Sequence, residues 1–343
     1  MKALNLHDID DLRYEDVILE PRNNDEVTVH IKAAGICGSD IARVFTKGTY
    51  NFPTIPGHEF SGTIIEADNQ EFIGKNVAVF PLIPCGKCNY CQIGEYEICD
   101  KYDYYGSRRD GGFAEFLNVK TDNLVFLPDG MNLEMAAMCE PGAVGLHALR
   151  CGNVKAMDNV VIWGIGTIGF ILAYWLRVFG AKNIIMIARD DHKVRFANKL
   201  GFKNIINSNL IDPIEYILDI TNGIGADVCI EGTGNIEALE YCIKASRKHG
   251  SVVCMGNPNS DMNLAKDVYW QILRKQLHLI GTWNSSFNNI KNDWKDTIQA
   301  MYSDALPLEN LITHRFKLDE FEQAFSIMKE RSEYYCKVMF INS

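Results

Sequence analysis

The sequence lacks any long apolar run: no stretch of its 343 residues approaches about eighteen uninterrupted hydrophobic side chains, roughly the length that a membrane-spanning helix needs. The first residues, MKALNLHDIDDLRYED, also lack the basic start, the apolar stretch and the small-residue cleavage site of a signal peptide. These absences predict a cytoplasmic protein that does not act at a membrane.

Basic residues are outnumbered by acidic ones. The chain has 34 Lys and Arg against 44 Asp and Glu, which gives a net charge of -10. Because binding to a phosphate backbone needs a basic face, this balance argues against a nucleic-acid partner. With 47% hydrophobic and 23% charged side chains, the chain is ordinary globular material, long enough for two domains. An acidic enzyme of metabolism fits this composition best.

Hydrophobic periodicity divides the chain near residues 147 and 283. The middle part alternates β-branched apolar runs with amphipathic stretches, a pattern that predicts a doubly wound parallel sheet. Helix-like segments such as 170–179 and 192–200 end at glycines, Gly180 and Gly201, which suit the left-handed position after a helix. The six strands are predicted at 159–163, 183–188, 204–206, 226–230, 251–255 and 277–281.

The two flanking parts of the chain have a different pattern. Residues 1–147 show short strand-like runs separated by Gly, Pro and Asn, which predicts a mainly β domain. The last part has a helix-like stretch, 318–332, followed by the apolar run CKVMFI, which we expect to return to the first domain. The predicted division is therefore 1–147 for a catalytic domain, 148–282 for a nucleotide-binding domain, and 283–343 for the return segment.

A glycine-rich turn follows the first strand of the middle part. In GIGTIG the first glycine allows a tight turn, the second lets the backbone approach a pyrophosphate, and the third permits close packing of helix on strand. The motif alone is weak, but the alternating strands and helices that follow it favour a dinucleotide-binding Rossmann fold. The predicted cofactor-binding residues are Gly164, Gly166, Thr167, Ile168 and Gly169.

The end of the second strand suggests which dinucleotide is bound. An Asp or Glu usually meets the free ribose 2′-hydroxyl of NAD there, but this strand ends in Ala188 and is followed by Arg189. A guanidinium without a neighbouring carboxylate suits a 2′-phosphate, so NADP is predicted over NAD. The alternative is that Asp190 or Asp191 takes the ribose role, or only caps the helix that follows.

Cysteine is plentiful, and four of the eleven follow the pattern CxxCxxCx7C. Cytosolic thiols stay reduced, so such a cluster is better explained by metal ligands than by disulfides. Four thiolates complete a tetrahedral zinc and leave no place for substrate, which predicts a structural site. An iron–sulfur cluster is the alternative, although nothing else in the chain indicates electron transfer. The four ligands are Cys85, Cys88, Cys91 and Cys99.

A second group of residues contains the ligand types of an open metal site. Cys37, His58 and Glu140 lie in GICGSD, PGHEF and MCEPG. One thiolate, one imidazole and one carboxylate leave a coordination position free, as in sites where zinc polarises an oxygen. A histidine such as His58, taken alone, is more often a hydrogen-bonded structural residue than a ligand.

In order and spacing, these motifs resemble one family. GICGSD, PGHEFSG, the four-cysteine lobe, RRDGGFAEF, CEPGAVGLHAL, GIGTIG and GADVCIEGTG resemble the zinc-dependent medium-chain alcohol and polyol dehydrogenases across nearly the whole chain. The resemblance implies a GroES-like mainly β catalytic domain joined to a Rossmann domain with a six-stranded parallel sheet. It also implies two Zn²⁺ per chain, a nicotinamide cofactor and a homodimer or homotetramer.

The resemblance also implies roles for individual residues. Cys37 and His58 would bind the catalytic zinc, with Glu140 as the third ligand and Glu59 as a nearby, exchangeable one. Cys139 is the alternative third ligand. The same motifs give Asp40 a hydrogen bond to the His58 imidazole and give Ser39 the role of a proton relay; Ala42 stands where some relatives have a histidine that passes the proton onward.

The predicted substrate is a polyol or a polyol phosphate. Arg43, Lys47, Arg108 and Arg109 flank the zinc motifs, and arginine pairs well with phosphate oxygens. Each of them could instead be solvated or form ion pairs. Trp283 could line the pocket or be buried between the domains. The alternatives are a free-polyol, diol or threonine dehydrogenase, or a non-catalytic dinucleotide-binding protein.

Overall fold

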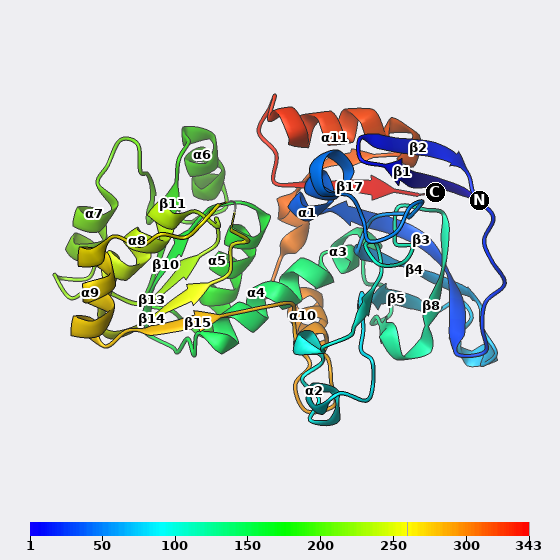
Figure 1. The fold of residues 1–343 in the computed structure, drawn as a ribbon, viewed down its shortest axis with the longest axis horizontal. Helices are drawn as coiled ribbons and strands as arrows, with labels where there is room; N and C mark the ends of the chain where they lie inside the picture. The colour runs from blue at the N-terminus through cyan, green and yellow to red at the C-terminus, as the bar shows by residue number, and fades with distance from the viewer. Residues whose placement is uncertain (259, 343) are drawn as a thin grey trace. The chain divides into compact units, whose positions relative to one another are not determined.

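The computed structural model describes residues 1–258 and 260–342. The chain divides into two compact units, the first formed by residues 1–143 and from 286 onward, the second by Val144–Ser285. Among the residues described, no helix combines the length and apolarity needed to span a membrane. Figure 1 shows the elements of both units along the chain.

The first unit is built on a seven-stranded sheet with the order β16-β17-β3-β4-β5-β9, in which β8 also pairs with β3. Two small sheets, β1 with β2 and β6 with β7, complete its strands. The strand bounds are β1 Lys2–Asp8, β2 Asp11–Asp16, β3 Glu26–Ile36, β4 Glu59–Glu66, β5 Asn76–Val79, β6 Leu82–Ile83, β7 Asp103–Tyr104, β8 Phe116–Lys120, β9 Leu124–Phe126, β16 Ile312–Phe316 and β17 Lys337–Ile341.

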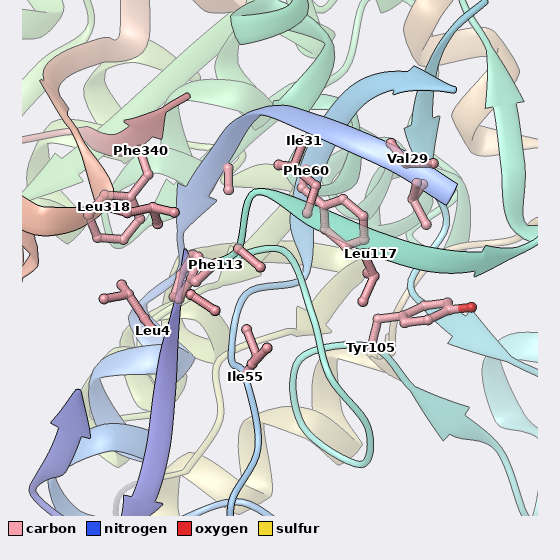
Figure 2. Close-up of a cluster of buried hydrophobic side chains, with 14 of the residues drawn as sticks. Leu4, Val29, Ile31, Ile55, Phe60, Tyr105, Phe113, Leu117, Leu318 and Phe340 are labelled. Carbon is pink, nitrogen blue, oxygen red and sulfur yellow. The ribbon is translucent and has the colours of Figure 1, made fainter. Parts of the chain in front are cut away.

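Short helices connect these strands. The sheet encloses an apolar core in which Phe60, Phe113 and Phe340 are at most 1% exposed. Figure 2 shows these rings, which come from separate strands and loops, with Leu4 and Ile31 of the same buried cluster. Such burial supplies most of the stability of a β domain. The helices are α1 Gly38–Ala42, α2 Asn89–Gln92, α3 Leu133–Ala137, α10 Asp293–Tyr302 and α11 Phe321–Glu330, and α4, Cys139–Cys151, begins in this unit and continues into the second.

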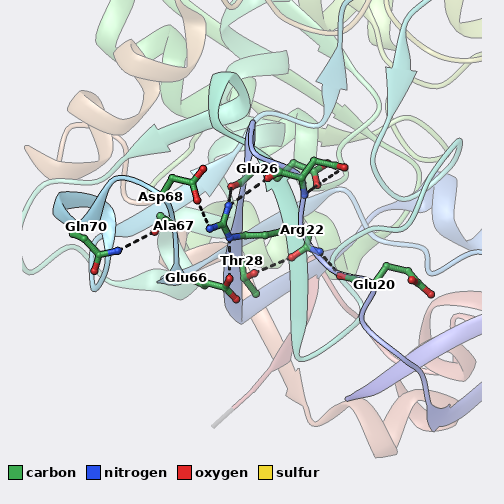
Figure 3. A network of polar contacts seen from close by, with 10 residues as sticks. Glu20, Arg22, Glu26, Thr28, Glu66, Ala67, Asp68 and Gln70 are labelled. Atoms are coloured by element: carbon green, nitrogen blue, oxygen red, sulfur yellow. Dashed lines mark hydrogen bonds and ion pairs between the residues drawn. The ribbon is translucent and has the colours of Figure 1, made fainter.

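The pairing of β3 with β4 places the motif residues. The strands are antiparallel, with Gly35 opposite Glu59, so the end of β3 lies beside the start of β4. At the other end of this pair, Arg22 Nε donates to Glu66 Oε1 at 3.0 Å, and Arg22 also bonds to Asp68, as Figure 3 shows. Because a one-residue slip would turn every side chain to the opposite face, the pairing register fixes which residues meet at the motif end.

The C-terminal strand completes the sheet. In β17, Val338 lies opposite Ile36 of β3 in antiparallel register, and Phe340 lies opposite Ala34. The helix-like stretch that precedes it is shorter than the sequence pattern predicts: α11 ends at Glu330 because Arg331 adopts a left-handed conformation with φ of 53°. The last strand therefore lies directly beside the strand that leads to Cys37.

The second unit is a six-stranded parallel sheet in the order β12-β11-β10-β13-β14-β15. This is the doubly wound order of dinucleotide-binding folds, with the direction of winding reversing between β10 and β13. The predicted fold class is confirmed, although β14 begins five residues before the predicted strand at 251. The bounds are β10 Asn159–Trp163, β11 Asn183–Ala188, β12 Ile205–Asn207, β13 Ala226–Glu231, β14 Ser246–Cys254 and β15 His278–Gly281, with helices α5 Thr167–Phe179, α6 Asp191–Lys199, α7 Pro213–Ile220, α8 Ile236–Ala245 and α9 Lys266–Lys275.

Candidate active site and metal centres

Three predicted ligands meet where β3 ends and β4 begins. Cys37 follows β3 and caps α1, while His58 immediately precedes β4 and Glu59 is the first residue of that strand. One ligand atom from each lies within 4.8 Å of the other two. A Cβ on Gly35 would come 2.3 Å from Glu59 Oε2, so only glycine leaves room for that carboxylate. Thiolate, imidazole and carboxylate donors at this spacing suit a divalent zinc.

Asp40 supports this group from the first turn of α1. Its carboxylate is fully buried and accepts a hydrogen bond from the backbone N–H of Cys37 at 2.9 Å. Asp40 Oδ1 also faces His58 Nδ1 at 3.4 Å, which would leave the other ring nitrogen of His58 to bind a metal. Burial raises the pKa of Asp40, but the charge of His58, its hydrogen bond and the charge of Arg43 outweigh it and lower the pKa to about 2.

Glu59 has a buried counter-ion that comes from the far end of the chain. Lys337 Nζ lies 2.5 Å from Glu59 Oε2 and also donates to the carbonyl of Ile36 at 3.2 Å. Both side chains are at most 3% exposed. Lys337 therefore holds the Glu59 carboxylate in place beside Cys37 and His58.

Glu140 is buried in α4, but it is not one of the three residues whose ligand atoms come together. Burial raises its pKa to about 7, against the charge of His58, which lowers it. The neighbouring Cys139 is fully buried and its Sγ lies 3.6 Å from the carbonyl oxygen of Trp294, to which it donates. Cys139 thus has a partner away from the cluster, which leaves Glu140 as the stronger candidate for a further ligand.

The four-cysteine lobe forms a second cluster. All four sulfur atoms lie within 4.8 Å of one another, in the loop that carries α2. Backbone N–H groups lower the pKa of Cys85 to about 6, whereas burial raises that of Cys91 to about 12. A divalent cation at the centre would allow all four thiols to deprotonate, so the donor set fits a closed structural site, as predicted. The ligands are Cys85, Cys88, Cys91 and Cys99.

The predicted cofactor turn lies at the carboxyl end of β10. Gly164 has φ of 102°, and a Cβ on it would come 2.6 Å from Thr233 Cγ2. Gly166 caps α5, and a Cβ on Gly169 would lie 2.4 Å from the Gly164 carbonyl oxygen. Backbone N–H groups at the start of α5 can therefore approach a pyrophosphate without obstruction. This turn lies where the strand order reverses, the position at which such sheets bind nucleotides.

The strand that should meet the cofactor ribose ends at Ala188, as the sequence indicates. Asp190 caps α6 by accepting from the backbone N–H of Lys193 at 2.9 Å, and Asp191 accepts from Asn207 Nδ2 at 2.8 Å. Arg189 forms an exposed ion pair with Glu237 at 2.9 Å. Of the alternatives left open by the sequence, capping by Asp190 is the one the structure shows.

Comparisons with known proteins agree with this geometry. The alcohol dehydrogenase GroES-like domain matches residues 23–129, and the zinc-binding dehydrogenase model matches residues 167–303. Galactitol 1-phosphate 5-dehydrogenase of Escherichia coli is 35% identical over 90% of this chain and 91% of the relative. L-idonate 5-dehydrogenase of Vitis vinifera is 32% identical over 96% of this chain and 91% of the relative. The chain belongs to the zinc-dependent medium-chain alcohol and polyol dehydrogenase family.

Solved structures of this family have the same fold. The crystal structure of galactitol-1-phosphate dehydrogenase from Escherichia coli matches with a TM-score of 0.93 and 32% identity over 100% of both chains. A zinc-binding dehydrogenase from Sinorhizobium meliloti bound to NADP matches at 26% identity and a TM-score of 0.90 over 99% of both chains. A short chain alcohol dehydrogenase from Escherichia coli complexed with NADH matches at the same identity and TM-score, over 100% of this chain and 99% of that one.

Membership in the dehydrogenase family decides several predictions. The predicted enzyme class is confirmed, and the non-catalytic alternative is set aside. The cysteine cluster is the structural zinc site rather than an iron–sulfur centre, and the Cys–His–Glu cluster is the catalytic zinc site. A nicotinamide cofactor belongs to the family, but NADP and NADH both occur among its matched structures.

The residues predicted to contact the substrate differ in the hydrogen bonds and ion pairs that they form with other side chains. Arg43 Nη1 donates to Ser39 Oγ and Asp40 Oδ1, and Arg109 Nε lies 2.9 Å from Asp103 Oδ2. The Arg108 guanidinium carbon instead lies 4.1 Å from the Tyr50 ring centroid and 4.7 Å from that of Tyr102. Trp283 lies in the second unit and is 50% exposed.

The sequence motifs do not predict two residues that lie beside the catalytic group. Lys337 is the first residue of the otherwise apolar strand β17, and a lysine in such a strand indicates a buried partner. Tyr104 lies with its ring centroid 5.9 Å from that of His58. Burial and the charge of Glu140 raise the pKa of its phenol well above the usual value, so Tyr104 stays protonated and can donate a hydrogen bond.

Proposed function

We propose that this dehydrogenase oxidises a sugar-alcohol phosphate, such as galactitol 1-phosphate, to the corresponding ketose phosphate. In the proposed reaction the substrate carbon loses a hydride to the nicotinamide ring of NAD(P)⁺ and its hydroxyl group loses a proton. The observation that carries the phosphate assignment is the environment of Arg108. The similarity to a relative that acts on galactitol 1-phosphate supports it.

Aromatic rings hold the Arg108 guanidinium in place without using its hydrogen-bond donors. Both Tyr50 and Tyr102 make cation–π contacts with it, and contacts of this kind contribute about 0.5–1 kcal/mol each at exposed sites. Within residues 1–258 and 260–342, no side chain or carbonyl accepts a hydrogen bond from this guanidinium. Its N–H groups are therefore available to an anion, and arginine binds phosphate oxygens in bidentate fashion.

A row of aromatic rings connects Arg108 with the catalytic group. The ring centroids of Tyr102 and Tyr104 are 6.1 Å apart, and Tyr104 in turn packs against His58. All these residues belong to the first unit. A polyol chain with its phosphate on Arg108 would extend along this row towards the metal ligands, which fits oxidation at a carbon far from the phosphate.

Other residues of the chain would bind the metal, orient a ligand and transfer the proton. We propose that Cys37, His58, Glu59 and Glu140 hold the catalytic zinc, which when bound lowers the pKa of a hydroxyl group that it polarises. Asp40 fixes the tautomer of His58 through Nδ1. Ser39 Oγ accepts the proton of the substrate hydroxyl and passes its own proton on.

Exchange of Arg108 for Met tests the substrate assignment. We expect KM for galactitol 1-phosphate to rise by tenfold or more, since a charged hydrogen bond contributes about 1.5–3 kcal/mol, while KM for galactitol changes little. Steady-state kinetics with both compounds gives the comparison. Exchange of Arg109 for Met is the matched control, because it removes the same charge from a residue already paired with Asp103.

Equal changes in KM for the ester and the free polyol would contradict the phosphate role of Arg108. If the unmodified enzyme prefers a free polyol, a diol or threonine, the alternative substrates named above replace the proposed one. A rate panel over these compounds, with each nicotinamide cofactor, separates the possibilities.

We also propose that NADP is preferred over NAD. The carboxylate of Asp190 is used as a helix cap, and Ala188 offers no side-chain acceptor for a ribose hydroxyl. The Arg189–Glu237 pair is more than half exposed on both sides, so it is weak and can yield to a 2′-phosphate.

Exchange of Arg189 for Gln should lower kcat/KM for NADP about tenfold and leave that for NAD nearly unchanged. Exchange of Arg195 for Gln, an arginine on the following helix α6, is the control. A wild-type enzyme that prefers NAD, or an Arg189 variant that loses both cofactors equally, would argue against this preference.

The two compact units support the proposed division into a catalytic domain, 1–147 with 283–343, and a nucleotide-binding domain, 148–282. We further propose a homodimer or homotetramer. The edge strand β15 and the adjacent helix α9 expose large apolar side chains, which marks an association surface. These are Tyr269, Trp270, Leu273 and Leu279. A monomer mass by light scattering would contradict the oligomer.

A further inference from the structure

We propose that Arg43 is a positioning residue that orients the hydroxyl of Ser39 for proton transfer, an inference that rests on the proposed relay role of Ser39. Arg43 immediately follows α1, four residues after Ser39 and three after Asp40. Residues at these spacings lie on the same side of a helical turn. Arg43 thus acts on the reaction through Ser39 rather than on the phosphate of the substrate.

The contacts of Arg43 are made by a single nitrogen. Its Nη1 lies 2.8 Å from Asp40 Oδ1, 3.0 Å from Ser39 Oγ and 3.5 Å from His58 Nδ1. The arginine side chain is 21% exposed, and its Asp40 partner is fully buried. Because His58 Nδ1 donates its hydrogen bond to Asp40, this nitrogen cannot accept one from Arg43. The contact between Arg43 and the imidazole is therefore a close approach and not a hydrogen bond.

The chemistry of the two groups fixes the direction of the bond between Arg43 and Ser39. A guanidinium has only donors, so Ser39 Oγ must accept from Arg43. This uses one lone pair of the hydroxyl and turns the hydroxyl proton away from Arg43. One lone pair remains to receive the proton of the substrate hydroxyl, and the Ser39 O–H remains to donate onward. Arg43 thereby selects the orientation that a relay needs.

The same property prevents Arg43 from being the next carrier of the proton. A guanidinium does not lose a proton near neutral pH and has no lone pair to accept one. Ala42 has no polar side chain either. Neither Ala42 nor Arg43 therefore accepts the proton from Ser39, and Arg43 affects only the geometry of the transfer.

The competing explanation is that Arg43 only balances the buried charge of Asp40. A charge-balancing role predicts that a lysine at position 43 restores function, because an ammonium three residues after Asp40 can still reach its carboxylate. A positioning role predicts incomplete rescue by lysine. The rigid guanidinium holds Ser39 Oγ and Asp40 Oδ1 in a fixed geometry, whereas an ammonium on a flexible side chain does not.

A double-mutant cycle separates the two explanations. We expect exchange of Ser39 for Ala to lower kcat about a hundredfold, as for loss of a proton-transfer group. Exchange of Arg43 for Met should lower kcat about tenfold in the native background and less than about twofold when Ser39 is already Ala. Exchange of Arg43 for Lys should recover thermal stability and zinc content but leave kcat reduced.

Three outcomes would overturn the proposal. The first is a kcat loss in the double variant equal to the product of the losses in the two single variants. The others are full recovery of kcat by Arg43→Lys, and a KM effect of Arg43→Met that is confined to the phosphate ester. The cycle uses whichever polyol the enzyme turns over fastest, so it remains valid if the phosphate assignment fails. Zinc content and the thermal midpoint of each variant show whether a loss of kcat has a merely structural cause.

Discussion

Exchange of Cys37 for Ser is expected to lower turnover by more than about a hundredfold and to remove one of the two zinc ions. Loss of a residue that merely orients a ligand already costs about 10–100-fold in metal affinity or activity, so loss of a thiolate ligand costs more. Among the described residues, only Cys37, His58 and Glu59 bring their donor atoms together in this cluster. Metal analysis and steady-state kinetics give the two measurements.

The matched control is exchange of Cys151 for Ser. This cysteine is also partly buried, but it lies at the end of α4 and approaches His147 rather than any cluster residue. It should keep two zinc ions per chain and native turnover. A Cys37→Ser variant with normal turnover would show that the Cys–His–Glu cluster is not where the hydride leaves the substrate.

The sequence predicts the metal clusters well because their ligands sit in local motifs. Cys37 directly follows the long strand β3 and His58 directly precedes β4, so the antiparallel pairing of these two strands is enough to bring them together. The four cysteines are likewise contained in one loop. In both clusters, residue type and short spacing carry most of the geometry.

Long-range partners are what the sequence pattern does not give. Lys337 meets Glu59 across 278 residues, and only the register of β17 on β3 places the two side chains together. The arginines flanking the motifs are indistinguishable by sequence. Whether a guanidinium is paired with a carboxylate, as Arg43 is, or contacts two tyrosine rings, as Arg108 does, depends on which loops pack around it.

Exchange of Lys337 for Met is expected to destabilise the first unit by about 3–5 kcal/mol, the usual cost of removing one partner of a buried ion pair. The variant leaves the Glu59 carboxylate, which is 1% exposed, without its counter-ion. It also leaves the Ile36 carbonyl without the bond that it accepts from Lys337 Nζ. Urea unfolding of the native and variant enzymes, each with its zinc, measures the change.

A second pair in the same unit provides the control. Lys120 and Asp25 approach to 2.5 Å, as Lys337 and Glu59 do, but their side chains are 30% and 65% exposed. Exchange of Lys120 for Met should cost only about 0–1 kcal/mol, because water solvates the remaining carboxylate. The double variant Glu59→Gln with Lys337→Met should regain much of the loss, since no unpaired buried charge remains. If Lys337→Met is as mild as Lys120→Met, the counter-ion role of Lys337 is wrong, and Glu59 must be compensated from the metal side alone.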